Sequence, residues 1–381
     1  MTEQRASATS FGANEGASDL AAILKRRGIS RREFLRFCAV IGGTLALPAG
    51  FGSQIAEALE KAKKLPVVWL EFQDCAGCTE SFLRASHPTT AEIVLDVLSV
   101  DYHETIMAAS GHLAEEAKHH TMEAGGYLLV VEGAIPLADG GVYCCVSGQT
   151  AEDLLMEAAA SAAAVIAVGS CATFGGLPKA APNPTGAVGV MDLIKDKPVV
   201  NLPGCPLNVV NLTATIVHYL TFNELPEMDD LHRPLFAHGA RIHDNCERRG
   251  HFDAGEFVME WGDEGHRKGW CLYKMGCKGP IAFFNCPTVR WNEGTSWPVA
   301  SGHGCIGCAL PDFWELGAYK TVDIQKFTPP ATYPSVEEAE EDISVVDVGI
   351  VGGLAGLAGL AIGAAGMAAA RRSQSGEKEG G

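Results

Sequence analysis

The side chains best suited to bind metal in this chain fall into three groups. Ten of the thirteen cysteines, together with one histidine, lie at spacings typical of iron–sulfur ligands. The first group is Cys75, Cys78, Cys171 and Cys205, the second is His243, Cys246, Cys271 and Cys277, and the third is Cys286, Cys305 and Cys308. Several clusters in one chain usually form an electron path, so these residues predict an electron-transfer protein.

Each group has a ligand set that suits a particular cluster. Four thiolates, as in the first group, suit a [4Fe–4S] cluster, and adjacent glycines let backbone N–H groups approach its sulfides. In the second group His243 replaces one thiolate and removes a negative charge, which should raise the reduction potential and favour a cluster that faces the surface. The three thiolates of the third group suit a [3Fe–4S] cluster, or a [4Fe–4S] cluster with one non-thiolate ligand.

Composition leaves other uses for the cysteines open. Disulfides are an alternative in an exported protein, and a four-cysteine set could bind zinc. Thirteen cysteines among 381 residues are too sparse for a disulfide mini-protein. Cys144 and Cys145, outside the three groups, are expected to be buried structural thiols. The formal net charge of −17 argues against nucleic acid and anionic lipid as partners through bulk charge.

The N-terminus has the pattern of an export signal. Residues 30–35 read Ser-Arg-Arg-Glu-Phe-Leu, a twin-arginine motif, and an apolar run over 37–51 follows that is too short for a stable anchor. Residues 1–58 are therefore predicted to be a twin-arginine signal peptide, with cleavage expected near 49–60. This route carries folded proteins, often with cofactors already inserted, which favours metal clusters over disulfides.

The C-terminus is predicted to be a membrane anchor. Residues 348–370 contain no charged residue and could cross a bilayer as a helix, so we assign 346–370 to a transmembrane anchor. An acidic linker, 331–345, precedes it, and a tail, 371–381, begins with Arg371 and Arg372. Because a basic flank stays in the cytoplasm, the folded body should lie on the periplasmic face of the cell membrane.

Alternating strands and helices are predicted over residues 59–230. Apolar runs over 67–72, 164–168 and 199–202 each end just before a cysteine of the first group, and a fourth run covers 127–131. Such runs, separated by helical stretches such as 151–164, are typical of an α/β fold with a flavodoxin-like, doubly wound parallel sheet. Ligands of such sheets bind beyond the carboxyl ends of the strands, where the first group would meet.

Residues 231–330 have a different character. This segment is rich in Gly, Pro, Trp and Cys and has few periodic apolar runs. It is predicted to be an irregular iron–sulfur cluster-binding domain for the second and third groups. Bound metal would supply the stability that secondary structure does not, because metal affinity becomes folding free energy.

Together these residues resemble the small subunit of a [NiFe] hydrogenase of the exported, membrane-anchored uptake type. The resemblance extends over almost the whole chain. The motifs that carry it are CAGCTES at 75–81, GSCATFGG at 169–176, PGCP at 203–206, RIHDNC at 241–246, GWCLYKMGCKGP at 269–280 and GCIGC at 304–308.

The resemblance implies three clusters and a catalytic partner. It assigns a proximal [4Fe–4S] cluster to the first group, a distal [4Fe–4S] cluster to the second and a medial [3Fe–4S] cluster to the third. Hydrogen would be split into two protons and two electrons at a Ni–Fe site in a large subunit, so no catalytic residue is expected in this chain. Electrons would pass from the proximal through the medial to the distal cluster, and then to a membrane acceptor such as a b-type cytochrome. A higher-order assembly of heterodimers is expected.

Three positions depart from the pattern of some family members. Oxygen-tolerant members carry extra cysteines around the proximal cluster, where this chain has Gly77 and Gly176, so oxygen sensitivity is expected. Many members have Thr where this chain has Ala76. Asp74, Glu80 and Glu132 lie beside the loops of the first group, and a carboxylate there could pass protons, with Asp74 and Glu80 as the candidates for a proton relay. A loop carboxylate that caps backbone N–H groups is at least as good an interpretation.

Three alternative functions remain on the sequence alone. The chain could be the iron–sulfur subunit of another membrane oxidoreductase, which would need only the first group. It could be a stand-alone electron carrier, or an exported structural protein held by zinc or disulfides. A stand-alone carrier should place its first cluster near a polar surface of its own.

Overall fold

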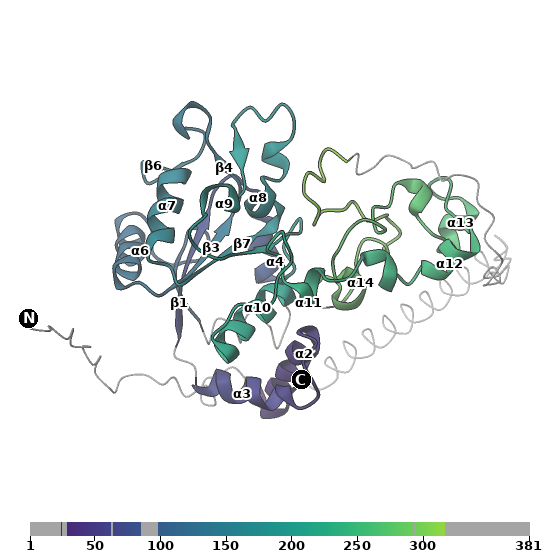
Figure 1. The fold of residues 1–381 in the computed structure, drawn as a ribbon, viewed down its shortest axis with the longest axis horizontal. Helices are drawn as coiled ribbons and strands as arrows, with labels where there is room; N and C mark the ends of the chain where they lie inside the picture. Colours follow the sequence, from purple (N-terminus) through teal and green to yellow (C-terminus); the bar gives the residue numbers. More distant parts are fainter. Residues whose placement is uncertain (1–23, 25–28, 62–63, 85–97, 293, 317–381) are drawn as a thin grey trace, which may run out of the picture. The chain divides into compact units, whose positions relative to one another are not determined.

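A computed structural model gives the fold over residues 24, 29–61, 64–84, 98–292 and 294–316 (Figure 1). The described residues all belong to one compact unit, Met1–Pro334. The predicted linker 331–345, anchor 346–370 and tail 371–381 lie outside them, as do residues 1–23 of the predicted signal. Within the described ranges, no helix is both long enough and apolar enough to cross a membrane.

Five parallel strands form the central sheet, in the order β2-β1-β3-β7-β9. They are β1 (Leu65–Glu71), β2 (Leu98–His103), β3 (Leu128–Glu132), β7 (Ala164–Val168) and β9 (Val199–Leu202). This order is that of a flavodoxin-like doubly wound sheet. β7 and β9 have the predicted bounds, and β1 and β3 are shifted by one or two residues. The edge strand β2 has no counterpart in the sequence prediction.

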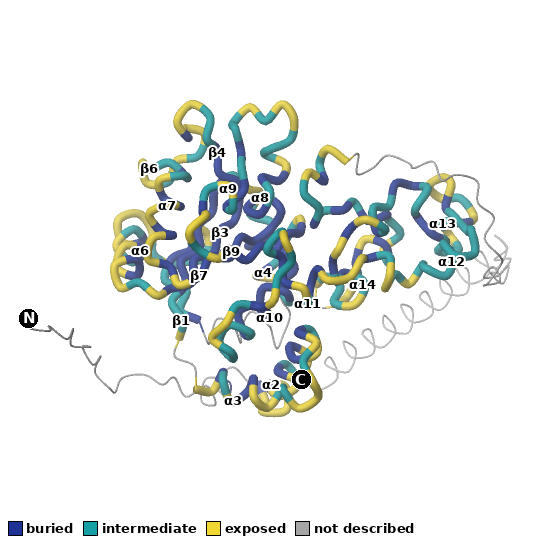
Figure 2. Tube along the Cα trace, viewed as in Figure 1, coloured by how far each residue is buried: buried dark blue, intermediate teal, exposed yellow. Residues whose placement is uncertain are grey.

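Helices cover both faces of this sheet. Leu129 of β3 faces a core that includes α6 (His112–Ala124) and α7 (Ala151–Ser161). Its neighbour Val130 faces a second core that includes α4 (Gly77–Leu83) and α10 (Val209–Phe222). Because successive side chains of a strand point to opposite faces, the central strands are apolar and buried along their length (Figure 2).

Short elements surround the carboxyl ends of the strands. They are β4 (Ile135–Pro136), η1 (Ala138–Gly140), β5 (Cys145–Val146), β6 (Gln149–Thr150), α8 (Gly169–Phe174), η2 (Leu177–Lys179), β8 (Ala187–Val188) and α9 (Val190–Leu193). Cys145 lies in the hairpin of β5 and β6 and is exposed, whereas Cys144 is half-buried. The prediction that both are buried is therefore wrong for Cys145, because the apolar stretch folds into a surface hairpin instead of entering the core.

Two helices from the predicted signal pack on α10. They are α2 (Arg31–Thr44) and α3 (Phe51–Lys61), and both contact each other and α10. Phe34 and Ile55 are buried with Val217 of α10 in an apolar cluster separate from the two sheet cores. The side of α10 that faces away from the sheet is thus covered by the predicted signal.

The second half of the described chain has only short helices. They are α11 (Leu235–His238), η3 (Ile242–Asn245), α12 (Arg249–Ala254), α13 (Glu264–Arg267), η4 (Tyr273–Met275) and α14 (Cys286–Val289). The segment agrees with the irregular domain expected from its composition. Its small apolar core contains Val258, Phe284 and Trp297, together with the thiols of Cys286 and Cys305.

Uncharged hydrogen bonds join this segment to the sheet. The side-chain amides of Asn211 and Asn285 donate to each other, with N–O distances of 3.0 and 2.8 Å. The Ser170 hydroxyl donates to the carbonyl of Cys308. Because Asn285 directly precedes α14 and Cys308 is the last cysteine, these bonds hold the third group against the sheet.

Candidate metal centres

The first group gathers at the carboxyl edge of the sheet. Cys75 follows β1, Cys171 lies in α8 directly after β7, and Cys205 follows β9. Cys78 is buried in the first turn of α4, and its thiol is close enough to those of Cys171 and Cys205 to raise its pKa further. Parallel strands thus bring the four residues to one place, although Cys78 and Cys171 belong to short helices and not to loops. Cys75 and Cys205 are exposed.

Backbone packs tightly around these thiols. The N–H of Leu207 donates to Cys78 Sγ at 3.4 Å. A Cβ on Gly169 would lie 2.4 Å from the same sulfur, and one on Gly176 would lie 2.5 Å from Cys171 Sγ. Burial, reinforced by the neighbouring thiol of Cys205, raises the pKa of Cys171 to about 12. A metal that binds here must therefore displace protons from the thiols.

The second group surrounds a smaller cavity in the second half of the chain. His243, Cys246, Cys271 and Cys277 all line it. Burial and the charge of Arg249 lower the pKa of His243, so its imidazole is neutral and can act as a ligand. His243 is half-buried, with its ring edge against Phe252 at a centroid distance of 4.5 Å.

The third group lines a cavity of about 710 Å³. Cys286, Cys305 and Cys308 contribute thiols to its wall, and Pro298 lines it as well. Burial raises the pKa of Cys308 to about 11 and those of the other two thiols further. The cavity extends to Cys205, so it adjoins the first group.

Hydrogen bonds place the third group between the other two. The N–H of Cys305 donates to Cys277 Sγ of the second group at 3.2 Å, and the N–H of Lys278 donates to the Cys305 carbonyl at 2.7 Å. On the other side, Ser170, the neighbour of Cys171, donates to the carbonyl of Cys308. The three groups therefore form a continuous series with the third in the middle.

The ligand sets and their surroundings fit iron–sulfur clusters. Soft thiolates select Fe–S clusters or zinc, and backbone N–H···S bonds are the contacts that tune cluster potentials. Such bonds reach the sulfurs of four of the predicted ligands, Cys78, Cys246, Cys277 and Cys305. Three adjoining thiol-rich sites favour a redox chain over isolated structural zinc.

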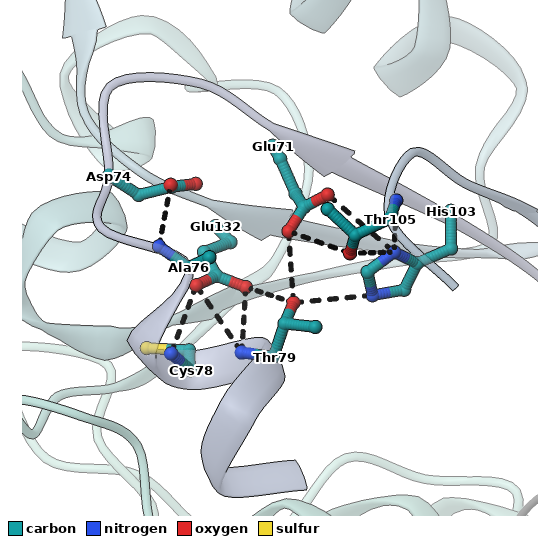
Figure 3. Close-up of polar contacts among 8 residues, drawn as sticks. All are labelled: Glu71, Asp74, Ala76, Cys78, Thr79, His103, Thr105 and Glu132. Atoms are coloured by element: carbon teal, nitrogen blue, oxygen red, sulfur yellow. Dashed lines mark hydrogen bonds and ion pairs between the residues drawn. The ribbon is translucent and has the colours of Figure 1, made fainter. Parts of the chain in front are cut away.

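A buried carboxylate network lies beside Cys78 (Figure 3). The Thr79 hydroxyl lies 2.7 Å from Glu132 Oε2 and 3.0 Å from Glu71 Oε1. Glu132 also accepts the N–H of Cys78 at 3.0 Å. Burial raises the pKa of Glu132 to about 7, and it raises the pKa of Glu71 as well. Since a hydroxyl has one proton, both contacts are hydrogen bonds only when one carboxyl is protonated and donates to Thr79.

His103 completes this network without adding a charge. Its Nε2 lies 3.3 Å from Thr79 Oγ1, and its Nδ1 lies 3.6 Å from Glu71. Burial lowers the pKa of His103 to about 4. The imidazole is therefore neutral near pH 7, and its approach to Glu71 is not an ion pair.

The two predicted relay residues occupy different surroundings. Asp74 is exposed and accepts the Ala76 N–H at 2.9 Å, and its carboxylate lies within 4.8 Å of those of Glu71 and Glu132. Glu80 is exposed on α4 and pairs with Arg84 at 3.1 Å, outside that cluster. Glu71 and Thr79 are absent from the sequence prediction, although a carboxylate that ends an apolar run is a detectable signal.

The chain thus combines an α/β sheet with three adjoining groups of Cys and His side chains, one at the sheet edge and two in the irregular second half. This combination defines an iron–sulfur electron-transfer protein. Comparison with known families narrows this class. The family of the C-terminal part of the NiFe/NiFeSe hydrogenase small subunit matches residues 238–319. A second family, described as "NADH ubiquinone oxidoreductase, 20 Kd subunit", matches residues 75–219.

Individual relatives match most of the chain. It is 45% identical over 322 residues to the Hydrogenase-2 small chain of Escherichia coli K12, covering 84% of this chain and 87% of that protein. It is 48% identical over 297 residues to the quinone-reactive Ni/Fe-hydrogenase small chain of Wolinella succinogenes, covering 77% and 84%. A reduced Ni–Fe–Se hydrogenase from Desulfomicrobium baculatum superimposes with a TM-score of 0.63 at 36% identity, over 68% of this chain and 100% of that one.

The chain belongs to the [NiFe] hydrogenase small-subunit family. It is the electron-transfer subunit of an H2-oxidising oxidoreductase, related to uptake and quinone-reactive hydrogenases. The proposal that it serves another oxidoreductase, or works without a catalytic partner, does not agree with these relatives.

The packing at Gly176 predicts that a side chain there disrupts the first site. Gly176 has a φ of +57°, and a Cβ would lie 2.6 Å from the Cα of Cys171 as well as 2.5 Å from its sulfur. Gly176→Ala should displace Cys171 and remove up to about four iron atoms per chain. Iron per purified heterodimer, measured by emission spectroscopy, gives the result.

Gly148→Ala is the matched control for backbone strain. Gly148 also has a positive φ, +85°, but a Cβ there meets nothing within 4 Å. Gly148→Ala should therefore retain its iron. If both variants keep the full iron content, the close packing at Gly176 does not control the site.

Proposed function

We propose that the first and second groups each hold a [4Fe–4S] cluster and the third a [3Fe–4S] cluster. In this proposal the chain carries electrons from the Ni–Fe centre of a large subunit to a membrane acceptor. The observation that carries the proposal is the position of the third group between the first, through Ser170 and Cys308, and the second, through Cys277 and Cys305. One-electron reduction and reoxidation is the chemistry that the bound clusters supply.

The protein itself supplies ligands and N–H donors. The side chains of Cys286 and Cys305 are buried in the apolar core of the second half. In the first group Cys75 and Cys205 are exposed, and the nearby loops expose Val142 and Leu177. An exposed ligand set beside apolar side chains is the kind of surface that a large subunit would cover.

Protons released in the partner need a way out, and the carboxylate network is suited to conduct them. Asp74 lies at the exposed edge of the carboxylate cluster, and the Thr79 hydroxyl connects Glu132 to Glu71. With a pKa of about 7, Glu132 can take up and release a proton near neutral pH. We therefore keep Asp74 and Glu132 in the proposed relay and add Thr79 and Glu71. Glu80, paired with Arg84, is left out.

Thr79→Val should interrupt this relay while keeping the shape of the side chain. Without its hydroxyl, residue 79 no longer connects Glu132 to Glu71. Hydrogen-dependent dye reduction should therefore fall by about tenfold or more. Hydrogen–deuterium exchange between H2 and D2O should fall with it, because that reaction needs proton transfer but no electron transfer through this chain.

Thr105→Val is the control for this variant. Thr105 lies at 3.4 Å from Glu71 and does not connect it to Glu132. The Thr105→Val variant should keep most of the wild-type rate of exchange between H2 and D2O. If Thr79→Val lowers dye reduction but leaves the exchange rate unchanged, the defect is in electron transfer and the relay does not pass through Thr79.

Export and anchoring follow from the two termini. We propose that residues 1–58 are a twin-arginine signal, that 346–370 anchor the body on the periplasmic side, and that the acceptor is a b-type cytochrome or a similar membrane protein. Arg31 and Arg32 are exposed at the start of α2, so the motif stays accessible while Phe34 is buried. Heterodimers would assemble further in the membrane.

The packing of α3 on α10 predicts slow removal of the signal from the folded precursor. The proposed boundary at residue 58 lies inside α3, and a protease must wait for this helix to open. Val217 is fully buried in the cluster that holds α2 and α3. Val217→Asp should place a charge there and speed cleavage of the purified precursor within 51–61 by about tenfold or more.

Val40→Asp tests whether any added charge has this effect. Val40 is 54% exposed on α2. It should leave the cleavage rate unchanged, as read from a time course on gels. If the wild-type and Val217→Asp precursors are cleaved at equal rates, packing on α10 does not protect the signal from the protease.

The central experiment is purification of the native complex from membranes, with metals counted and hydrogen-dependent dye reduction assayed. We expect a large subunit, nickel and about eleven cluster irons per small subunit, the sum of two [4Fe–4S] clusters and one [3Fe–4S] cluster. About twelve irons would indicate a four-iron cluster in the third group. Iron with neither nickel nor a large subunit would favour a stand-alone carrier instead.

A further inference from the structure

The second and third groups meet where two short segments, 277–278 and 304–305, lie side by side. The N–H of Cys305 donates to Cys277 Sγ at 3.2 Å, and the N–H of Lys278 donates to the Cys305 carbonyl at 2.7 Å. Burial raises the pKa of Cys305, and the neighbouring thiol of Cys277 raises it further. Because these two cysteines belong to different groups, the first bond leads from a ligand of one site directly to a ligand sulfur of the next.

Gly304 allows the two segments to approach so closely. It is buried directly before Cys305, and a Cβ there would lie 3.0 Å from both the Cα and the Cβ of Cys277. Such contacts are tighter than normal packing, and neither atom can turn away as the end of a long side chain can. The φ of Gly304 is not positive, so the backbone conformation does not itself require glycine. A side chain is therefore excluded here by packing against the second group.

The N–H···S bonds around the ligands differ in what they join. In one kind the donor lies two residues after a ligand and the acceptor is a sulfur of the same group, as for Leu207, Arg248, Gly279 and Gly307. The bond from Cys305 to Cys277 instead joins ligands of neighbouring groups. Burial raises the pKa of Cys308 to about 11, and a hydrogen bond from the backbone of Cys205, in the first group, acts against this rise. Both junctions of the series thus have a direct contact between ligands.

We propose that Gly304 holds the Cys305 N–H on Cys277 Sγ, and that the electron crosses from the third group to the second at this hydrogen bond. The inference rests on the proposed function, which places clusters in both groups. One electron leaves the third cluster, which is oxidised, and enters the second, which is reduced. No covalent bond forms or breaks, and the proton stays on the Cys305 nitrogen. The same N–H favours the reduced, more negative state of the second cluster and so raises its reduction potential. Gly304 is thus a positioning residue.

Gly304→Ala in the complete heterodimer tests this proposal. Iron is counted first. The electron paramagnetic resonance signal of the reduced second cluster, recognised by its coupling to the His243 nitrogen, is then titrated against potential, and its exchange interaction with the reduced third cluster is measured. We expect full iron, a lower midpoint potential for the second cluster and a smaller exchange interaction. Hydrogen–deuterium exchange between H2 and D2O should keep its wild-type rate, because that reaction needs no electron transfer through this chain.

Gly269→Ala is the matched control. Gly269 lies two residues before Cys271 of the second group, and a Cβ there meets nothing within 4 Å. Its φ is +74°, so alanine adds backbone strain at this position that it does not add at Gly304. The control should nevertheless keep the wild-type midpoint potential and exchange interaction. Equal changes in both variants would overturn the proposal, and so would full iron in Gly304→Ala with both quantities unchanged.

The remaining outcomes separate this inference from the proposed function. If the wild-type heterodimer carries no cluster in the second or the third group, both proposals fail. With all clusters present, a lower potential at an unchanged exchange interaction means that the bond tunes the second cluster but is not where the electron crosses. A smaller exchange interaction at an unchanged potential means that the N–H is not the contact. Either result overturns this inference while the cluster assignment stands.

Loss of iron from Gly304→Ala also gives an answer. If about four irons remain, those of the first group, the added methyl group has separated the ligands of the other two groups, as expected for a positioning residue. The wild-type protein then decides the crossing point, because a measurable exchange interaction between its second and third clusters supports it and the lack of one overturns it. Loss of all iron would overturn the proposal, since packing at Gly304 would then support the whole fold.

Discussion

The hydroxyl of Ser170 joins three segments that would otherwise be far apart in the structure. It accepts the N–H of Gly204 at 3.0 Å, next to Cys205, and it donates to the carbonyl of Cys308. The backbone N–H of Ser170 also donates to Gly204, at 2.9 Å. One residue, next to Cys171, thus joins the segment that carries Cys205 to the last cysteine of the chain. The described part of the second half needs this constraint, because its longest helix has six residues and cannot position ligands on its own.

Much of the sheet could be predicted because its strands are buried on both faces. Runs such as Ala164–Val168 consist of Ala, Val and Ile that are all buried, so their bounds follow from composition alone. β2 could not be predicted in this way, because it is an edge strand that is only partly buried and has polar residues between its apolar ones. The residues after 231 could be recognised as irregular, but their short helices are set by ligands and neighbouring segments and leave no periodic signal.

The metal groups and the carboxylate network differ in how far the sequence reveals them. Cysteine spacing is a strong signal, and each predicted ligand lies beside the other members of its group in the structure. The network is harder to foresee, because it depends on register. Glu71 and Glu132 end adjacent strands and are paired opposite each other, which the sequence cannot show. Asp74 could be predicted as a candidate because it precedes Cys75, and Glu80 because it lies two residues after Cys78. Of these two, only Asp74 lies among the other carboxylates.

Several of the hydrogen bonds between the two halves join neutral groups, and this has a consequence for electron tunnelling. The Asn211–Asn285 pair, the bond from Asn208 to the Arg290 carbonyl at 2.6 Å and the bond from Ser170 carry no net charge. Dissolved ions weaken attractions between exposed charges but have little effect on such buried contacts. Tunnelling rates depend steeply on the separation of the redox centres. These neutral bonds help to keep that separation the same at low and at high ionic strength.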